Sequence, residues 1–305
     1  DTVVEIDLIP NTATAADYGT PSTTSVTILA GDTSASLTIP TIDDNIVESA
    51  EDFNVSGNVT SGNTQNTDPT GIVIITDNDA TEFSIGDITV DEGVGNATVP
   101  VILSNPSSVD TQISITQTNG TAGDDDYTET NITVTIAAGL TQANVSIPIL
   151  DDNINEAEEV FTVNGELVSG NTTNSNATGT VTITDNDGAP TVSIDNITVP
   201  EDVGSAQVTV SLSNPSSVDT VLDITQTAGS AGTDDYTETI TTVTIAAGLT
   251  QTVVSIPIID DNINEANEVF TVNAEVTAGN TSNNNTSGTV TITDNDGAPT
   301  VSIDN

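Results

Sequence analysis

The chain of 305 residues has no Lys, Arg, His or Cys, and each absence excludes a class of chemistry. Because 46 Asp and Glu residues face no basic side chain, the formal net charge is −46. Nucleic acids and anionic membranes are therefore poor partners, since binding them depends on Lys and Arg. Without Cys there is no disulfide framework and no thiolate metal site, and without Lys there is no isopeptide crosslink.

Long apolar runs and aromatic side chains are also scarce. No apolar run approaches the length of a membrane span, and aromatic residues make up 2 % of the chain. A high charge of one sign often marks disorder, but only 15 % of the residues are charged and 34 % are hydrophobic. Since the hydrophobic residues fall in patterned runs, we expect a folded chain whose charge repulsion is offset by something outside the sequence.

The sequence does contain one unit of 108–109 residues, written nearly three times. The phrase Ile-Thr-Asp-Asn-Asp ends at Asp79, Asp187 and Asp296. A period of this length matches a small domain rather than a solenoid repeat. We expect a partial repeat that lacks its first strands, two complete repeats and the start of a further one, at 1–79, 80–187, 188–296 and 297–305. The chain would then be a window on a longer array.

The third repeat shows the alternation of a half-buried β-strand. Val254, Ile256 and Ile258 alternate with polar residues or proline, and similar runs rich in Val, Ile and Thr recur between turn signals. Seven antiparallel strands are predicted at 191–199, 205–213, 219–227, 236–245, 251–259, 268–277 and 287–294. This pattern favours an all-β fold of tandem immunoglobulin-like β-sandwiches. Phe53, Phe161 and Phe270 and the three tyrosines are predicted core anchors.

The predicted sandwich places its acidic residues unevenly. In an antiparallel arrangement, the first, third and fifth connections and the end of the last strand lie at one pole. Nine acids of the third repeat fall there, namely Glu201, Asp202, Asp234, Asp235, Asp260, Asp261, Glu265, Asp294 and Asp296. The loops of the opposite pole hold at most Asp219, although they are equally polar.

Such crowding of acids needs a partner of opposite charge. Two carboxylates about 5 Å apart repel by roughly 3 kcal/mol, so six or more would exceed a typical stability of about 5–15 kcal/mol. Proton uptake, dispersal into solvent or bound metal would relieve the repulsion. Flexible loops rich in carboxylates suit Ca²⁺, which takes about 6–8 oxygen ligands, whereas Mg²⁺ demands a stricter octahedron. The competing interpretation is that these loops are simply acidic and solvated.

Four motifs give the repeats a family resemblance. They are Val199-Pro200-Glu201-Asp202-Val203-Gly204, Asp235-Tyr236, Ile259-Asp260-Asp261-Asn262-Ile263-Asn264-Glu265 and Asp294-Asn295-Asp296. In these the chain resembles Calx-β domains, the calcium-binding sandwiches of sodium–calcium exchangers and many bacterial surface proteins. One departure from the strongest binders is Asn at positions 78, 186 and 295, where those members have a third terminal Asp.

The resemblance implies Ca²⁺ ligands at equivalent positions of all three repeats. In the third repeat they are Glu201, Asp235, Asp260, Asp261, Glu265, Asp294 and Asp296. In the second they are Glu92, Asp126, Asp151, Asp152, Glu156, Asp185 and Asp187. In the first they are Asp17, Asp43, Asp44, Glu48, Asp77 and Asp79. No other cofactor is implied.

The array of domains also resembles the stalks of giant repetitive adhesins on Gram-negative surfaces, such as the gliding-motility adhesins of Bacteroidota. Only Gly188, Ala189 and Pro190 separate two repeats, so we expect closely spaced domains that form a rod. The leading hypothesis is an extracellular cell-surface stalk rigidified by Ca²⁺. Its partners would be neighbouring repeats, Ca²⁺ and a surface ligand held by a tip outside this segment.

Two other function classes are weighed against the stalk. The repeats could bind glycan, ice or another surface polymer through Thr-rich strand faces, although few aromatic platforms exist for sugar. Carboxylate pairs could serve glycoside hydrolysis. The absence of His, Cys and Lys and the recurrence of the acids in every repeat favour an ion site in each module over one catalytic centre, so no catalytic residue is assigned.

Overall fold

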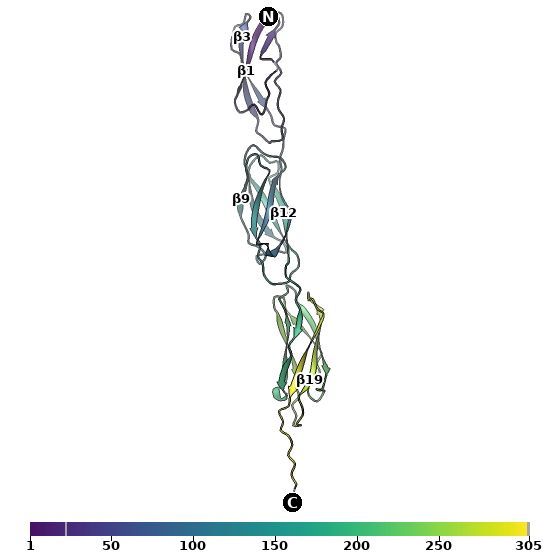
Figure 1. The fold of residues 1–305 in the computed structure, drawn as a ribbon. Helices are drawn as coiled ribbons and strands as arrows, with labels where there is room; N and C mark the ends of the chain where they lie inside the picture. The colour runs from purple at the N-terminus through teal and green to yellow at the C-terminus, as the bar shows by residue number, and fades with distance from the viewer. Residues whose placement is uncertain (22, 304–305) are drawn as a thin grey trace. The chain divides into compact units, whose positions relative to one another are not determined.

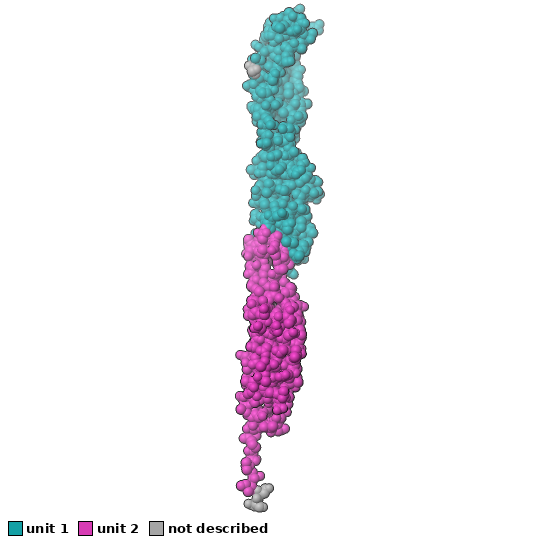
Figure 2. Space-filling view, turned by 90° about the vertical axis from the view of Figure 1, so that its right-hand side faces the viewer, with its two compact units in different colours: residues 1–88, 96–148, 160–181 teal, residues 89–95, 149–159, 182–305 magenta. Residues whose placement is uncertain are grey.

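A computed structural model describes residues 1–21 and 23–303, and it divides into two compact units. Unit 1 comprises Asp1–Ile88, Asn96–Pro148 and Val160–Val181, and unit 2 comprises Thr89–Gly95, Ile149–Glu159 and Thr182–Asn305 (Figure 2). The second repeat therefore contributes to both units, and the predicted domain boundaries stay a prediction. Positions 304 and 305 of the predicted segment 297–305 lie outside the described residues.

Strands dominate every repeat (Figure 1). The first has β1 (Thr2–Pro10), β2 (Ser25–Ile28), β3 (Glu51–Ser61) and β4 (Thr70–Ile75). The second has β5 (Phe83–Ile85), β6 (Ile88–Asp91), β7 (Asn96–Leu103), β8 (Thr111–Asn119), β9 (Ile132–Ile136), β10 (Gln142–Pro148), β11 (Glu159–Ser169) and β12 (Asn176–Thr184). The third has β13 (Val192–Ile194), β14 (Ile197–Pro200), β15 (Ser205–Leu212), β16 (Thr220–Ala228), β17 (Thr241–Ile245), β18 (Gln251–Pro257), β19 (Glu268–Ala278) and β20 (Asn285–Thr293).

Two short 3₁₀ turns, η1 (Glu92–Val94) and η2 (Glu201–Val203), interrupt the strands. No helix formed by the described residues is long and apolar enough to cross a membrane.

The third repeat is a two-sheet sandwich, as predicted. One sheet has the order β13-β15-β18 and the other β14-β20-β19-β16-β17. Buried residues from both sheets, including Val208, Ile256 and Val272, form one core. Tyr236 stacks on Phe270 within it, with ring centroids 4.0 Å apart, so this pair is a core anchor as predicted.

The other repeats vary this plan. The second repeat has sheets of order β10-β7-β5 and β6-β12-β11-β8-β9, and the ring of Tyr127 stacks on that of Phe161. The first repeat has one sheet, of order β2-β1-β3-β4, in the part of the chain that is described. Its small core contains Tyr18 and Phe53.

The prediction of one strand at 191–199 is wrong, because the structure has two. β13 pairs antiparallel with β15, whereas β14 pairs parallel with β20 in the other sheet. At the crossing, Asp195 N donates to Thr209 O (3.2 Å), while Asn196 Oδ1 accepts from Thr289 N (2.7 Å). Two polar residues thus each bond to a different sheet, and the chain switches between them. The predicted seven antiparallel strands become eight, with one parallel pair.

The predicted strand at 236–245 is shorter in the structure. Its regular part is β17 (Thr241–Ile245), and Tyr236 forms only an isolated bridge with Ile258. Tyr236 ends the turn that carries Asp235, and its backbone N donates to Gly232 O (3.3 Å). The turn uses the backbone groups that a strand would have paired.

The strand registers bring the acidic segments to one end of the third repeat. Pro200 pairs with Thr293 in the parallel pair, so the residues after β14 and β20 lie side by side. Glu268 pairs with Ile292, and Ala228 pairs with Phe270. The start of β19 and the end of β16 therefore lie at that same end, and the predicted gathering of these segments is confirmed.

Candidate metal site

Two groups of carboxylates occupy the acidic end of the third repeat. The Glu201 group consists of Glu201, Asp294 and Asp296, and the Glu268 group consists of Asp235, Glu265 and Glu268. Within each group, one carboxylate oxygen of every member lies within 4.8 Å of the others. Two segments distant in sequence thus converge on each group.

The Glu201 group forms where the parallel strands end. Glu201 opens the turn η2 directly after β14 and is buried, with 5 % of its surface exposed. Its Oε1 accepts a hydrogen bond from Asn295 N (3.0 Å), and Asp294 Oδ1 accepts one from Asp296 N (3.0 Å). Backbone N–H groups therefore fix two of the three carboxylates.

The segment before β19 connects the two groups. Asp294 Oδ2 accepts from Glu265 N (3.1 Å), which links the end of β20 to the Glu268 group. Asp260 Oδ1 accepts from the Asn295 side-chain amide (3.2 Å). Asp261 Oδ1 accepts from Ile263 N (2.6 Å) and thereby closes a local turn. Every sequence-predicted residue of this repeat thus lies at this end.

Asn295 explains the departure from the strongest calcium binders. Its backbone N–H bonds to Glu201 and its side-chain amide to Asp260, so one residue donates to two acids. An Asp at this position would keep the backbone donor, but its ionised side chain could only accept. In a chain without basic side chains, this Asn therefore supplies donors where an Asp would add charge.

The charges of the Glu201 group are only partly compensated. The Asn295 N–H lowers the pKa of Glu201, but burial and the charges of Asp294 and Asp296 raise it by more. Burial, followed by the charges of Asp294 and Asp260, raises the pKa of Asp296. The arrangement thus holds its acids against their preference to take up protons.

Two carboxyl groups of the Glu268 group also have raised pKa values. Burial, a hydrogen bond shared with Asp235 and the charges of Asp235 and Glu265 raise the pKa of Glu268 to about 7. Burial, followed by the charges of Asp261 and Asp235, raises the pKa of Glu265. Asp235 uses its Oδ2 to accept from Gly232 N (2.7 Å), which holds its loop in place.

The second repeat has a group equivalent to the Glu201 group, and this group lies within unit 2. Glu92, Asp185 and Asp187 each offer an oxygen within 4.8 Å of the others. Glu92 Oε1 accepts from Asn186 N (3.1 Å), and Asp151 Oδ1 accepts from the Asn186 side-chain amide (2.9 Å).

The remaining predicted residues of the second repeat keep equivalent roles. Asp152 Oδ1 closes the turn to Ile154 N (2.6 Å), and Glu156 N donates to Asp185 Oδ2 (3.2 Å). Asp126 belongs to unit 1, where its Oδ2 accepts from Gly123 N (2.7 Å).

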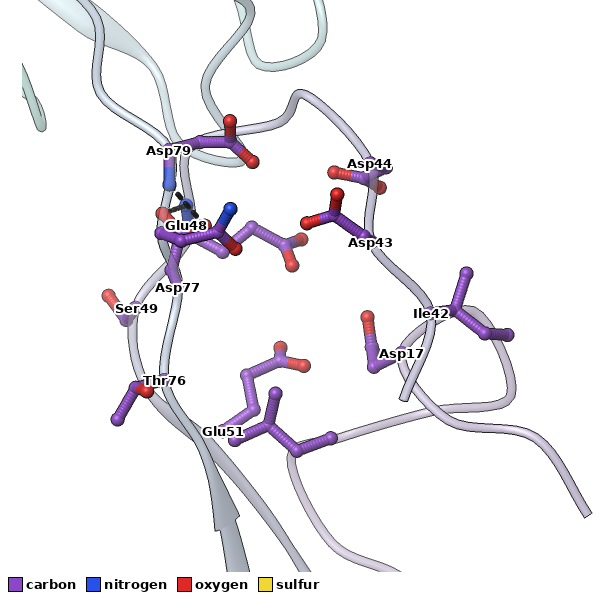
Figure 3. Close-up of a pocket in the computed structure, with 12 residues that line it drawn as sticks. Asp17, Ile42, Asp43, Asp44, Glu48, Ser49, Glu51, Thr76, Asp77 and Asp79 are labelled. Carbon is purple, nitrogen blue, oxygen red and sulfur yellow. Dashed lines mark hydrogen bonds between the residues drawn. The ribbon is translucent and has the colours of Figure 1, made fainter. Parts of the chain in front are cut away.

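The first repeat holds its acids around one cavity of about 40 Å³ in unit 1 (Figure 3). Asp17, Glu48 and Glu51 form its close group, within 4.8 Å. The other predicted acids, Asp43, Asp44, Asp77 and Asp79, line the same cavity. In Figure 3 the carboxylates of Glu48, Asp43 and Glu51 point toward a common centre. The volume exceeds the roughly 10–15 Å³ that one water-sized sphere requires.

The first-repeat acids have shifted pKa values of both signs. Burial, followed by the charges of Asp17 and Asp44, raises the pKa of Glu48. Burial also raises the pKa of Asp17, but hydrogen bonds from the Thr14 N–H and hydroxyl outweigh it, so the pKa falls. Asp17 therefore gives up its proton more readily than an ordinary Asp, whereas its neighbour Glu48 gives up its proton less readily than an ordinary Glu.

The donor set fits a hard divalent cation. Asp187 Oδ2 and Asp296 Oδ2, at equivalent positions of two repeats, are buried and accept no hydrogen bond. An ionised carboxylate oxygen can only accept, so a buried one without a donor is unfavourable unless a cation lies against it. The surrounding ligands are carboxylates, without His or Cys, which suits Ca²⁺ or Mg²⁺ better than Zn²⁺ or Cu²⁺.

Sequence reasoning missed three acids at the start of the β19-type strand. Glu51 and Glu268 each complete a close group, and Glu159 occupies the equivalent position of the second repeat. The predicted strand at 268–277 begins at Glu268, so the alternating pattern gave that acid a place in a strand rather than in the site. The recurrence of the three acids at the repeat period was the signal that could have found them, since no neighbouring strand position repeats an acid in all three copies.

Comparison with known proteins gives both a family and structural likenesses. A structure of CBD12 from CALX1.2 is 16 % identical, with a TM-score of 0.31, and the match covers 66 % of this chain and 83 % of that one. An apo-form Calx CBD1 domain is 21 % identical, with a TM-score of 0.30, covering 35 % and 99 %. A tetra-tandem repeat from the extending region of a large adhesion protein is 12 % identical, with a TM-score of 0.43, covering 95 % and 66 %. A search among curated proteins found no match.

The family assignment rests on the sequence. The family model described as "Calx-beta domain" matches residues 1–79, 75–187 and 185–296. These three matches together span almost the entire chain, and the acidic motifs of every repeat lie inside them. The chain therefore belongs to the Calx-beta domain family, as three tandem copies.

Proposed function

We propose that these repeats bind Ca²⁺ at their acidic ends and that the bound ions stiffen an extracellular, cell-surface stalk of a repetitive adhesin or filament. The observation that carries the proposal is the pair of buried, donorless oxygens, Asp187 Oδ2 and Asp296 Oδ2. Each lies in a group of three carboxylates that no basic residue of the chain can neutralise. A divalent cation supplies both the missing charge and the missing contact.

Two groups of carboxylates would hold ions in the third repeat. In the third repeat, Glu201, Asp294 and Asp296 form one candidate ligand set, and the Glu268 group forms a second. Bound Ca²⁺ would supply positive charge and accept several carboxylate oxygens in flexible geometry. The protein's own contribution is to hold these oxygens with backbone and Asn donors, so that the loops meet at one place.

The stalk role is supported by the way the linker is held. The backbone O of Gly188 accepts from the Asn214 side-chain amide (2.9 Å), and the O of Pro190 accepts from Ser282 N (2.9 Å). The linker that follows Asp187 is thus fixed to two loops of the third repeat. Ions that order the Asp187 segment would therefore also order the point where the third repeat begins.

The proposal is tested by comparing the full chain with Ca²⁺ and with chelator. Small-angle scattering should give a longer maximum dimension with a narrower distribution in Ca²⁺, and the melting temperature should rise. At a free concentration about 1,000 times the dissociation constant, one site contributes about 4 kcal/mol. The double variant Asp185→Asn, Asp294→Asn weakens the group of Glu92, Asp185 and Asp187 and the Glu201 group. It should lose most of the calcium-dependent change in length and in melting temperature. If neither the length nor the melting temperature responds to Ca²⁺, the proposed function is wrong.

A further inference from the structure

A neutral residue, Asn155, lies between the acidic segment of the second repeat and the loops of the third. Only 7 % of its surface is exposed. Its Nδ2 donates to Asp185 Oδ2 (2.8 Å) and to the backbone O of Asp187 (2.9 Å). Its Oδ1 accepts from the side-chain amide of Asn280 (3.0 Å), which lies in the turn between β19 and β20. One amide thus joins a candidate ion ligand to a loop of the next repeat.

The backbone of Asn155 is joined to a second loop of the third repeat. Its N donates to Pro215 O (3.0 Å), and its O accepts from Ser217 N (3.0 Å), so it forms a parallel bridge with Ser216. Ser216 is itself buried, and its O accepts from Gly248 N (2.9 Å). The loop that receives Asn155 is therefore held within its own repeat.

The equivalent residue of the first repeat, Val47, keeps only half of this arrangement. Its N donates to Pro106 O (2.9 Å) and its O accepts from Ser108 N (3.0 Å), so the backbone bridge is the same. A valine side chain has no donor or acceptor, so it cannot bond to Asp77 or to Asn171, the counterpart of Asn280. The two junctions of this chain thus share their backbone pairing and differ in the amide.

Asn264, the equivalent residue of the third repeat, shows what sets the amide's orientation. It is exposed, yet its Nδ2 donates to Asp294 Oδ2 (2.8 Å) and to Asp296 O (2.8 Å), as Asn155 does to the matching residues. The acidic segment of the same repeat therefore orients the amide without a following loop. This orientation leaves Asn264 Oδ1 available to accept a hydrogen bond, as Asn155 Oδ1 accepts one from Asn280.

We infer that Asn155 is a positioning residue that couples the acidic site of the second repeat to the third repeat, and that the Val47 junction lacks this coupling. The inference rests on the proposed binding of Ca²⁺ at Asp185 and Asp187. An ion held by the Asp185 carboxylate would fix the oxygen that orients the Asn155 amide. The amide would in turn hold Asn280 and the Ser216 loop, so the acidic site and the junction would become ordered together.

The experiment follows hydrogen exchange in the full 305-residue chain, with Ca²⁺ and with chelator. The reporters are the amides of Ser217 and Ser108, which pair with Asn155 O and Val47 O. In the wild type, Ca²⁺ should slow exchange at Ser217 about tenfold, the equivalent of one to two hydrogen bonds, and slow it much less at Ser108. Calorimetry on the same samples measures whether Ca²⁺ binds.

Two variants break the link from opposite sides. Asn155→Val copies the residue that the first junction tolerates, and Asn280→Ala removes the partner amide without touching the acidic site. Both should reduce the calcium response of Ser217 to that of Ser108, while Asn280→Ala leaves calcium affinity unchanged. Asn171→Ala is the matched control and should change nothing. Val47→Asn should bring the response at Ser108 up toward that of wild-type Ser217.

The outcomes separate the inference from the proposed function. If Ca²⁺ binds and both variants keep the full tenfold response at Ser217, the coupling through Asn155 is wrong. If Ca²⁺ does not bind the wild type, the proposed function fails. The samples in chelator alone then test the amide link through Asn155. Faster exchange at Ser217 in both variants than in the wild type would then support the amide link, and identical exchange would overturn it.

Discussion

Replacing Glu268 by Gln should change the stability of the third repeat in opposite directions with and without Ca²⁺. The side chain belongs to the Glu268 group, whose oxygens lie within 4.8 Å of one another. At an effective dielectric constant near 20, Glu268 and Asp235 at that separation repel by roughly 3 kcal/mol. Because both side chains are partly exposed and salt screens them, we expect a net gain of about 1 kcal/mol on removing the charge.

In chelator, this gain should appear as a melting temperature higher by about 4 °C for a domain of this size. The effect depends on pH, because burial and Asp235 raise the pKa of Glu268 to about 7. At pH 8 the folded carboxyl is ionised, and the substitution relieves the repulsion. At pH 5.5 it already carries a proton, so the gain should be lost.

In saturating Ca²⁺ the sign should reverse. Gln offers one neutral oxygen where Glu offered a charged carboxylate, and ligand charge is a main determinant of calcium affinity. The variant should bind Ca²⁺ about tenfold more weakly at this group and melt at a lower temperature than the wild type.

The assay is thermal unfolding in both conditions, with Glu166→Gln as the matched control. Glu166 is an exposed acid on the equivalent strand β11, where it pairs with Ser114 rather than with an acid. The control should leave both melting temperatures unchanged. A variant that is destabilised in chelator, or unchanged in Ca²⁺, would refute the account of the Glu268 group as a repulsive cluster relieved by an ion.

Three further predictions follow from the same geometry. Acidifying the calcium-free chain from pH 7.5 to 5.5 should raise its melting temperature. The raised carboxyl pKa values make the folded state bind more protons than the unfolded state between about pH 4.5 and 7. An unchanged or falling melting temperature would contradict this. Asn295→Asp, which removes the amide donor to Asp260 and adds a charge, should lower stability in chelator and raise calcium affinity, as measured by unfolding and calorimetry. Phe270→Ala should destabilise the third repeat by about 3–5 kcal/mol in denaturant unfolding, since the ring is fully buried against Tyr236; a loss below about 1 kcal/mol would contradict its role as a core anchor.

The alternating pattern predicted the sandwich well but not its strand connections. Periodicity identifies which residues face the core, as at Val254 and Ile256, whatever sheet the strand joins. The sheet switch at Asp195 and Asn196 depends on two hydrogen bonds to residues far along the chain, Thr209 and Thr289. Local pattern carries no record of such partners, so the break in the predicted strand was missed.

The sequence predicted the acidic site to about the same extent as it predicted the fold. Charge and repeat spacing marked the acids, and all of those predicted in the third repeat lie at one end. Asn155 was missed because it has no charge to mark it in an Asn-rich chain, and Asn295 was noted only as a departure from the strongest calcium binders. Asn295 and Asn155 nevertheless supply the donors that organise the carboxylates. Their roles depend on orientation, which only the folded arrangement specifies.

The central claim is that the acidic ends exist to hold Ca²⁺, and calorimetric titration of the chain tests it most directly. We expect saturable Ca²⁺ binding at one or more ions per repeat, with much weaker heat from Mg²⁺, whose stricter octahedron these flexible loops match poorly. Asp260→Asn, which alters an acid linked to the Glu201 group, should weaken the sites of the third repeat and leave the others intact. A titration with no saturable Ca²⁺ binding, or with Mg²⁺ binding equally well, would contradict the account.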